Sequence, residues 1–551
     1  MRPSPTPTVT LPPTPEAPVP QARPGLSPWD VASILALLGL AGVALLTFAD
    51  YGTTWDEPRQ QRYGELLLDY YRTLGADRSS LHYFDLFRYG PAFDLLVALL
   101  QQVSPLPTYA VRHLITAAVG LLGLGGTWLL ARTLAGPRAG FLALVLLSAA
   151  PDWYGHMYFN PKDVPFATAM VWALYALVRL LGGLPRLRLG ALLGFGLAAG
   201  LAMAIRVGGG VVFAYAGLLL VAWTVIAVRR RTPPPIAFTA GGLGALGLVG
   251  AGTLAAGLTL ALWPWAQQDP VDNVLTALRT FSDFPFDTRF VYAGEVVSSA
   301  DLPWHYLPVM LLVRLPEPVL VGLALVPLFA LRSERSAGNS AIVWAAVALA
   351  ALVPVADFLL VRPTLYDGIR HLIFILPPLV VIAAGALDRA WSGLPGRLWE
   401  VAMALVLLGW LGAQVQALVR VHPYQYILYN GLAGGVPGAN GRFELDYWGA
   451  SVKEATEGLV RELVARHGEG IARQPLRVAV CGPTDSVRPY LPEAWQAADA
   501  RDAGQGADLF VAVPKIPCEV ALQGETLVRA EREGALLSSA GQVRGGSVGP
   551  K

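Results

Sequence analysis

Uncharged apolar stretches recur along the chain, each separated from the next by a polar segment. The stretch ILALLGLAGVALL after Ser33 and the stretch GGLGALGLVGAGTLAAGLTLALW ending at Trp263 contain no charged residue. A helix of about 20 apolar residues crosses a hydrocarbon core of roughly 30 Å. The pattern predicts an α-helical, polytopic membrane protein with about 11 spans. The expected spans are 31–49, 109–131, 139–152, 164–182, 189–206, 210–228, 237–263, 306–331, 341–361, 371–388 and 399–420.

Arginine is concentrated in five short segments between these spans. They contain Arg132 and Arg138, Arg186 and Arg188, Arg229 to Arg231, Arg332 and Arg335, and Arg389 and Arg397. Short cytoplasmic loops of membrane proteins are enriched in Lys and Arg, so we expect these loops and the N-terminus to be cytoplasmic. The outer segments are then 50–108, 153–163, 264–305, 362–370 and all residues after 420.

Residues 90–104 (GPAFDLLVALLQQVS) do not fit this alternation. The segment is apolar, but it is shorter than a span and contains Asp94. If it crossed the membrane, the loop with Arg132 and Arg138 would lie outside, against the positive-inside rule. We therefore expect a juxtamembrane or re-entrant helix at the outer surface.

The two ends of the chain differ from the apolar middle, residues 29–420. Residues 1–28 are rich in proline and have no apolar block, so we expect a disordered cytoplasmic tail. After residue 420 charge returns, RVAVCGP (477–483) and ADLFVAV (507–513) predict buried strands, and 450–466 predicts a helix. Residues 421–551 are therefore expected to form a small α/β domain outside the membrane.

Both cysteines of the chain, Cys481 and Cys518, lie in this predicted α/β domain. In an oxidising compartment the two thiols could form a disulfide. The sequence equally allows two buried thiols.

Composition excludes several function classes. Of the 551 residues, 54% are hydrophobic and 15% are charged, whereas soluble domains average about 25% charged residues. The net charge is +2, and no basic cluster with interleaved aromatic residues suggests nucleic-acid binding. The sequence also has no HExxH motif, CxxC pair or dense histidine cluster, so a metal is not indicated.

Adjacent carboxylates follow the first span, in Thr54-Trp55-Asp56-Glu57-Pro58. Charges at a membrane exit are costly unless they are solvated, paired or functional. One of the two could take a proton from an acceptor hydroxyl as a general base. The alternative is an ordinary charged loop at the end of a helix.

The second outer loop combines charge with two prolines, in Asn160-Pro161-Lys162-Asp163-Val164-Pro165. The prolines restrict the backbone around the two charged residues. We expect Asp163 to lie on the same face as Asp56. The alternative, an Asp that caps the next helix, is compatible with that position.

Arginines also occur at helix ends on the predicted outer side. Arg206 precedes three glycines, and Arg370 stands beside His371 at the start of a span. Such arginines either snorkel to lipid headgroups or clamp a phosphate by bidentate hydrogen bonds. Arg314 and Glu317 are expected to pair, because they lie three positions apart in one span.

Several motifs resemble a known superfamily. The acidic pair in TWDEP (54–58) is typical of multispanning, lipid-dependent glycosyltransferases of the C superfamily (GT-C). NPKDVPF (160–166), DGIRHLIFILPP (367–378) and HPYQYILYNGLAGGVPGANGRFELDYWG (422–449) resemble bacterial family-39-like members. From about residue 30 onward the layout is similar to that of bacterial protein O-mannosyltransferases and aminoarabinose transferases, and it implies a GT-C-like fold.

The resemblance implies roles for particular residues. Asp56 would be the catalytic base, with Glu57 as its neighbouring partner and Asp163 at the acidic position of the second loop. Arg370 and Arg206, with His371 and Lys162 beside them, would hold the phosphate of a polyprenyl-phosphate sugar. Weaker candidates for substrate binding are His305, Tyr306 and Asp446. Aminoarabinose transferases can carry a divalent metal, but its ligands have no match here, so no metal or other cofactor is assigned.

These observations favour an inverting glycosyltransferase that works at the outer face of the cell membrane with a lipid-phosphate-sugar donor. The sugar, a hexose or a pentose, is not determined by the sequence, and the acceptor could be a protein, a lipid or a polysaccharide. The main alternative is a transporter or lipid flippase, which would place its charges near the bilayer midplane. A receptor or assembly factor would leave the acidic pair unexplained.

Overall fold

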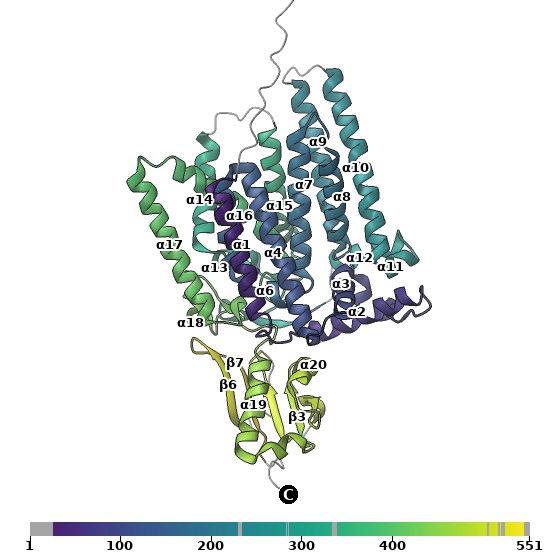
Figure 1. The fold of residues 1–551 in the computed structure, drawn as a ribbon, viewed down its shortest axis with the longest axis vertical. Coiled ribbons are helices and arrows are strands. Elements are labelled where there is room, and N and C mark those ends of the chain that lie inside the picture. The colour runs from purple at the N-terminus through teal and green to yellow at the C-terminus, as the bar shows by residue number, and fades with distance from the viewer. Residues whose placement is uncertain are drawn as a thin grey trace, which may run out of the picture.

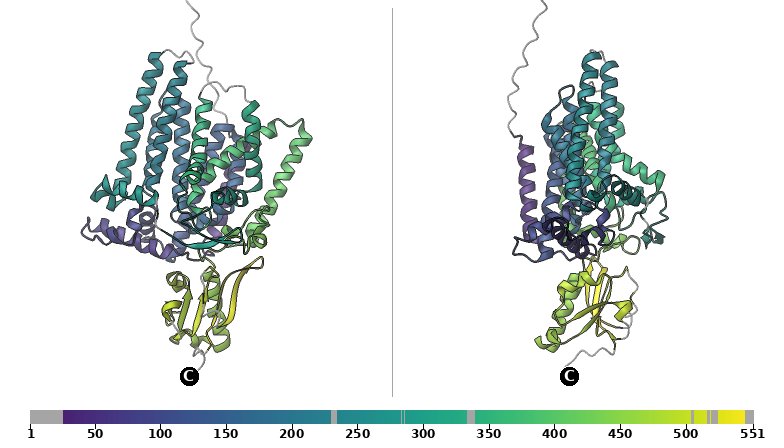
Figure 2. Two further views of the ribbon diagram at one scale, coloured as in Figure 1. Left: turned by 180° about the vertical axis from the view of Figure 1, so that it is seen from behind. Right: turned by 90° about the vertical axis from the view of Figure 1, so that its right-hand side faces the viewer.

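The structure is a computed structural model that describes residues 26–229, 234–282, 284, 286–332, 339–503, 506–515, 518 and 524–544. It consists of a bundle of long helices with a smaller α/β unit at one end (Figure 1). The expected disordered tail lies largely outside the described residues, which begin at Leu26. The α/β unit lies beyond the same end of the bundle in the other two views (Figure 2).

Eight helical segments in the described ranges are long and apolar enough to cross a membrane. They are α1 (Pro28–Thr47), α4 (Thr108–Ala135), α7 (Asp163–Gly183), α9 (Val211–Arg229) with the short helix η3 (Val207–Gly210), α10 (Pro234–Leu262), α15 (Ser340–Val361), α16 (Leu376–Ser392) with η4 (Arg370–Ile375), and α17 (Arg397–Arg420). Each one coincides with a span expected from the apolar pattern. The chain is therefore a multi-pass membrane protein.

The other three expected spans differ from long straight helices. Helices α5 (Pro137–Ser148) and α8 (Leu189–Met203) are apolar but short. The span expected over 306–331 is broken into two helices, α13 (Tyr306–Arg314) and α14 (Glu317–Arg332), with a bend of 118° between them. Pro316 follows the extended residue Leu315, and proline disfavours a helical conformation in the residue before it. Long helices in the described ranges thus give eight spans, or nine with the bent pair, instead of eleven.

Shorter elements cover the end of the bundle beside the α/β unit, which we call the C-domain face (Figure 1). They are α2 (Glu57–Arg72), α3 (Ala92–Gln101), α6 (Pro151–Phe159), α11 (Pro264–Gln268), α12 (Asp272–Ser282), the hairpin of β1 (Arg289–Tyr292) and β2 (Glu295–Ser298), and the single turns η1 (Ser79–His82) and η2 (Leu86–Arg88). Helix α3 lies where a short surface helix was expected for 90–104. It packs against α2 and α4, and its Asp94 pairs with the buried Arg112.

The residues after α17 first line the C-domain face and then form the α/β unit. Five strands have the order β4-β3-β5-β7-β6, with β3, β4 and β5 parallel and β7 and β6 antiparallel. Their bounds are β3 Arg477–Cys481, β4 Gln496–Asp499, β5 Leu509–Ala512, β6 Glu525–Arg532 and β7 Ala535–Gln542. The helical elements are η5 (Gln425–Ile427), α18 (Gly435–Ala439), α19 (Val452–His467), η6 (Glu469–Arg473), α20 (Thr484–Val487), η7 (Arg488–Tyr490) and α21 (Ala500–Ala503). Both strands and the helix expected here are confirmed, and α19 buries Leu459 and Leu463 in the core that also contains Val480 and Val511.

The two cysteines form a disulfide, which settles the alternative that the sequence left open. Cys481 ends β3, and Cys518 lies beyond β5. The bond therefore ties the segment after β5 to the end of the neighbouring strand.

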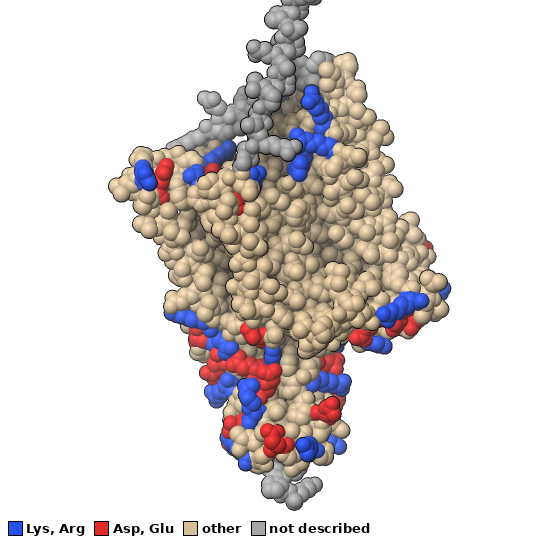
Figure 3. Space-filling view, viewed as in Figure 1, with Lys and Arg blue, Asp and Glu red and all other residues tan. Residues whose placement is uncertain are grey.

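On the face of the bundle that Figure 3 shows, charged side chains lie near its two ends. In the face shown in Figure 3, a broad band without Lys, Arg, Asp or Glu divides the far end of the bundle from the C-domain face. Arg132 pairs with Asp30 at the start of α1, and Arg138 pairs with Asp388. Of the other arginines in the expected basic loops, Arg230, Arg231 and Arg335 lie outside the described residues.

One expected ion pair is wrong. Arg314 does not pair with Glu317; its guanidinium contacts Asp152 of α6, with Nε 2.9 Å from Oδ2. The bend at Pro316 separates the two side chains, and Glu317 instead accepts hydrogen bonds from the Trp410 indole and the Gly431 amide.

Candidate active site

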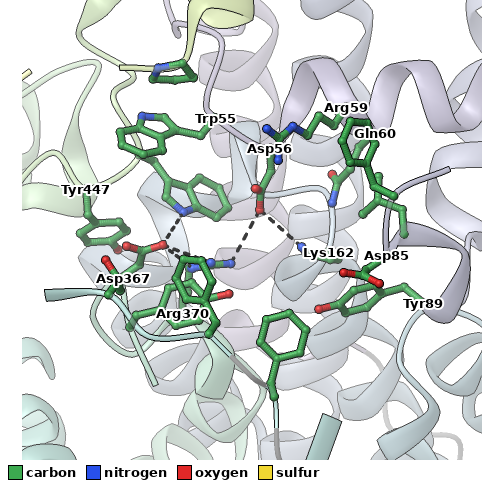
Figure 4. A pocket seen from close by; sticks show the side chains of 18 of the residues that line it. Trp55, Asp56, Arg59, Gln60, Asp85, Tyr89, Lys162, Asp367, Arg370 and Tyr447 are labelled. Atoms are coloured by element: carbon green, nitrogen blue, oxygen red, sulfur yellow. Dashed lines mark hydrogen bonds and ion pairs between the residues drawn. The ribbon is translucent and has the colours of Figure 1, made fainter. Parts of the chain in front are cut away.

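A cavity of about 480 Å³ lies at the C-domain face, between the helical bundle and the α/β unit. Its wall is built from segments that are far apart in the sequence: the start of α2, the turn around η2, the loop before α7, the loop before β1, the start of η4 and the loops around β3 and β5. Figure 4 shows these side chains converging on one space. The wall contains both charged groups and aromatic rings, the latter from Trp55, Tyr89, Tyr366 and Trp448.

Asp56 occupies the position directly before α2 and projects into this cavity (Figure 4). Its Oδ2 lies 3.4 Å from Lys162 Nζ and 3.9 Å from Arg370 Nη1. Burial raises the pKa of the Asp56 carboxyl, but the positive charges of Lys162 and Arg370 outweigh this effect and hold the pKa below its ordinary value. Asp56 is therefore an ionised carboxylate that is open to the cavity, with 34% of its side chain exposed.

Arg370 is held so that one side of its guanidinium faces the cavity. Asp367 Oδ2 accepts from Nε and lies 3.1 Å from both Nε and Nη2. The rings of Tyr366 and Trp448 lie 4.8 and 5.0 Å from the guanidinium carbon. The remaining Nη1 is buried, lies 3.6 Å from Asp163 Oδ2, and makes no hydrogen bond within the described part of the chain. Among the described residues, Nη1 thus lies near the carboxylates of Asp56 and Asp163 without a hydrogen bond to either.

Asp163 lies behind these groups instead of in the cavity wall. It begins α7, and its backbone N–H donates to Asn160 Oδ1 at 2.8 Å, so the Asn160 side chain performs the capping that was considered for Asp163. Asp163 Oδ1 pairs with Arg206, and Oδ2 accepts from Asn160 Nδ2 at 2.9 Å. Arg206 is therefore engaged by Asp163 and does not line the cavity.

The structure places Glu57 outside the cavity, although it is adjacent to Asp56. Its Oε2 accepts from Thr54 N–H at 2.8 Å and from Thr54 Oγ1 at 3.0 Å, and its Oε1 lies 3.0 Å from His113 Nε2. Successive residues of a helix point about 100° apart, so the two neighbouring carboxylates face different surroundings. Glu57 thus holds the start of α2 in the protein interior and does not line the cavity.

Four other candidates also lie outside the cavity wall. His371 is packed edge-on against the ring of Tyr366, with 4.7 Å between the ring centres. The ring of His305 contacts the Tyr292 hydroxyl at 2.8 Å, and the Tyr306 hydroxyl donates to the Gly368 carbonyl at 3.0 Å. Asp446 accepts from the backbone N–H of Ala450 at 3.0 Å and of Ser451 at 3.1 Å, and also from the Tyr426 hydroxyl. These side chains contact neighbouring segments of the protein and do not line the cavity.

Several cavity residues were missed in the sequence, among them Asp367, Gln60 and Lys515. Asp367 lies three positions before Arg370, and an acid at that spacing was an available signal. Gln60 lines the cavity one helical turn after Asp56, and its Oε1 accepts from Arg112 Nη2 at 3.3 Å. Lys515 reaches the cavity from the α/β unit and had no local signal, because its partners are distant in the sequence.

The site can hold an anion next to a carboxylate base. Lys162 and Arg370 supply positive charge, and Asp56 supplies an acceptor for a proton. Within the described ranges, no three His, Cys, Asp or Glu side chains are grouped so that they could hold a metal ion.

Comparisons with known proteins identify a partial family match and a similar fold. Residues 90–251, which include Lys162 and Asp163, match the family described as dolichyl-phosphate-mannose-protein mannosyltransferase. The apo structure of ArnT from Cupriavidus metallidurans is similar over 95% of this chain and 99% of its own, with a TM-score of 0.50 and 18% identity. The chain therefore has the fold of GT-C glycosyltransferases.

Two further solved structures are similar to this chain at lower scores. ArnT from Cupriavidus metallidurans bound to undecaprenyl phosphate has a TM-score of 0.47 and 17% identity, over 95% of this chain and 99% of that one. The oligosaccharyltransferase AglB from Archaeoglobus fulgidus, with an inhibitory peptide and a dolichol phosphate, has a TM-score of 0.45 and 14% identity, over 88% and 70%. No curated protein sequence matches the chain. The GT-C-like fold implied by the sequence motifs is confirmed.

Proposed function

We propose that the chain transfers a sugar from a polyprenyl-phosphate-linked donor to an acceptor, with inversion at the anomeric carbon. The observation that carries the proposal is the position of Asp56 beside two cations, one of which, Arg370, presents a buried N–H group that has no hydrogen-bond acceptor among the described residues. An N–H group in that position suits a phosphate oxygen. The family matched by residues 90–251 is described by a donor of this chemistry, a sugar on a lipid phosphate.

We place the reaction on the outer side of the membrane. The arginines Arg132 and Arg138 lie at the end of the bundle opposite the C-domain face. Because short cytoplasmic loops are rich in arginine, that end is cytoplasmic and the cavity and the α/β domain (421–551) are extracytoplasmic. A disulfide in this domain is consistent with an oxidising compartment.

The reaction balances without a nucleotide or a redox partner. The acceptor oxygen or nitrogen attacks the anomeric carbon, and its proton passes to Asp56. The bond between the anomeric carbon and the phosphate oxygen breaks on the opposite side, and the electron pair leaves with the polyprenyl phosphate. Lys162 and Arg370 stabilise the negative charge that develops on this leaving group.

Donor binding would also activate the base. In the free protein Lys162 and Arg370 hold the pKa of Asp56 below its ordinary value. When these cations turn to the donor phosphate, part of their charge is neutralised and the pKa of Asp56 rises. A carboxylate with a higher pKa is a better proton acceptor, so the base becomes effective only when the donor is present.

The remaining residues of the site have supporting roles in this proposal. Asp163, itself paired with Arg206, faces Arg370 Nη1 and so orients the guanidinium. His371 packs against Tyr366, one of the two rings that contact Arg370. The sugar is a hexose or a pentose, and the acceptor is a protein, a lipid or a polysaccharide.

The test uses the full chain in liposomes with a panel of radiolabelled polyprenyl-phosphate sugars, followed by identification of the labelled product. Wild-type protein should label an acceptor with at least one donor. Asp56→Asn should lower the transfer rate by about 10²- to 10⁴-fold, the usual contribution of general base catalysis. The matched control is Glu65→Gln on the exposed face of α2, which pairs only with Arg62 and Gln61 among the described contacts. Full activity of Asp56→Asn would exclude Asp56 as the base.

The same liposomes separate the proposal from lipid translocation. A flippase would move the labelled donor between leaflets without forming a product. Flipping of the donor by wild-type protein, with no sugar transfer to any acceptor, would overturn the proposed function.

A further inference from the structure

Lys515 belongs to the α/β unit but projects into the cavity of the helical bundle. Its Nζ lies 2.8 Å from Asp367 Oδ1 and 3.0 Å from Glu444 Oε1. Both carboxylates belong to segments that line the C-domain face, before η4 and before α19 respectively. The ammonium group also lies 5.9 Å from the centre of the ring of Trp55, the residue that precedes Asp56 in the sequence.

The contacts of Lys515 lead to Arg370 through one shared carboxylate. Asp367 uses Oδ1 for Lys515 and Oδ2 for Nε and Nη2 of Arg370. The Trp448 indole N–H also donates to Oδ2, at 3.3 Å. Both oxygens of the Asp367 carboxylate are therefore held by hydrogen bonds. The position of this carboxylate sets the direction in which Arg370 Nη1 points.

The charge of Lys515 matters as well as its contacts. In a buried site, an unbalanced carboxylate beside Arg370 would compete with any incoming anion for the positive charge of the guanidinium. Lys515 neutralises the second oxygen of Asp367. Arg370 can then direct its charge at Nη1, the atom without a hydrogen-bond acceptor in the described structure.

The disulfide holds the two loops of the α/β unit that reach the cavity. Cys481 ends β3, and Pro483, two residues later, lines the cavity wall. Cys518 lies three residues after Lys515, and the Cα atoms of the two cysteines are 5.6 Å apart. One covalent bond thus fixes both cavity-lining segments of this unit to each other.

We propose that Lys515 is a positioning residue of the donor site, held in place by the Cys481–Cys518 disulfide, so that the α/β unit completes the site that binds the donor phosphate. The inference rests on the proposed function for the identity of the anion. It assigns to the α/β unit a part in donor binding. The acting group remains Arg370, which Lys515 orients through Asp367.

The first test compares three variants of the full chain in nanodiscs. Lys515→Met should raise the donor KM about tenfold, the size expected for loss of one charge-assisted hydrogen bond next to the site, with a smaller change in kcat. Lys515→Arg keeps the charge and should recover most of this loss. Arg501→Met is the control in the same unit, since its side chain is 88% exposed and pairs with Asp499. An unchanged KM in Lys515→Met, or an equal loss in the Arg variant, would overturn a positioning role based on charge.

A double-mutant cycle separates action through Asp367 from direct contact with the donor. If Lys515 acts through Asp367, then Lys515→Met should add little to the loss already caused by Asp367→Asn. If the fold-changes in donor KM of the two single variants multiply in the double variant, Lys515 acts independently of Asp367, which would contradict the proposal. The double variant Cys481→Ser/Cys518→Ser should raise the donor KM, as Lys515→Met does. An unchanged KM would show that the disulfide has no part in positioning Lys515.

Binding of undecaprenyl phosphate alone keeps this inference distinct from the proposed function. Wild-type protein should bind this probe about tenfold more tightly than Lys515→Met, whether or not a sugar is transferred. Equal affinities with normal wild-type transfer would refute the role of Lys515 only. Absence of transfer with the affinity difference intact would refute the proposed reaction and leave the anion site standing.

Discussion

The two ends of the helical bundle use the same residue types in different ways. At the end opposite the α/β unit, Arg132 pairs with one carboxylate and has 36% of its side chain exposed. At the C-domain face, Arg314 and Arg370 are 1% and 4% exposed, and Arg370 faces three carboxylates. The partner of Arg132, Asp30, is itself buried, but a partly exposed arginine can also be solvated by water, whereas a buried arginine depends on its protein partners. An arginine of the candidate site is therefore distinguished by its burial and by the carboxylates that share it. An arginine that only indicates the orientation of the chain in the membrane lacks these features.

The largest expected effect is on folding at the C-domain face. Arg314→Met leaves Asp152 buried without its cation and should lower the free energy of unfolding by about 3–5 kcal/mol. Arg132→Met at the other end should lower it by less, because Asp30, although buried, keeps its hydrogen bonds from the Ser27 N–H and hydroxyl. Denaturant unfolding of the two variants in the same detergent measures both values. Equal losses would mean that the two ends do not differ as described.

The next effect is on activity. Arg370→Met removes a donor aimed at the leaving phosphate and should lower kcat by about 10²- to 10³-fold. Arg138→Met breaks the pair with Asp388, the hydrogen bond to the Ser392 hydroxyl and the contact with Trp391 at the opposite end, and its transfer rate should stay near the wild-type rate. Steady-state transfer assays compare them. Loss of activity in both variants would indicate that Arg370 acts through folding.

A smaller effect distinguishes the adjacent carboxylates Asp56 and Glu57. Glu57→Gln should keep transfer within about tenfold of wild type, because the side chain is buried against Thr54 and His113 and does not reach the cavity. It should instead lower the melting temperature, since a buried hydrogen-bonded group loses part of its partners. A loss of kcat as large as that of Asp56→Asn, at unchanged stability, would return Glu57 to the catalytic site.

The smallest expected effect concerns pH. Burial raises the pKa of Glu444 to about 7. The positive charge of Lys515 lowers this pKa, and the negative charge of Asp367 raises it. Between the ordinary pKa of a glutamate and pH 7, the folded protein binds the proton more tightly than the unfolded chain does. Stability should therefore fall as pH rises through this range and level off above pH 7. Thermal unfolding at pH 5 and pH 8 should show this slope in wild type and a weaker one in Glu444→Gln.

The apolar pattern determined most of the helices, because a segment that crosses a bilayer must satisfy its backbone hydrogen bonds internally. The fold class, the surface helix near Asp94 and both strands of the α/β unit followed from such local regularities. The motifs around Asp56, Lys162 and Arg370 also followed, since unpaired charge beside a span is costly and therefore conspicuous. The structure brings those three residues into one cavity.

Only the tertiary structure decided which partners these charges have. Arg314 pairs with Asp152 instead of Glu317, because the bend at Pro316 changes the direction of the chain. Lys515 meets Asp367 across 148 positions of sequence. Spacing along the chain carries no information about contacts between units, because these depend on how the α/β unit packs on the bundle. The sequence by itself therefore determined the membrane fold and the principal charges of the candidate site, and the packing of distant segments decided the pairing that gives the site its chemistry.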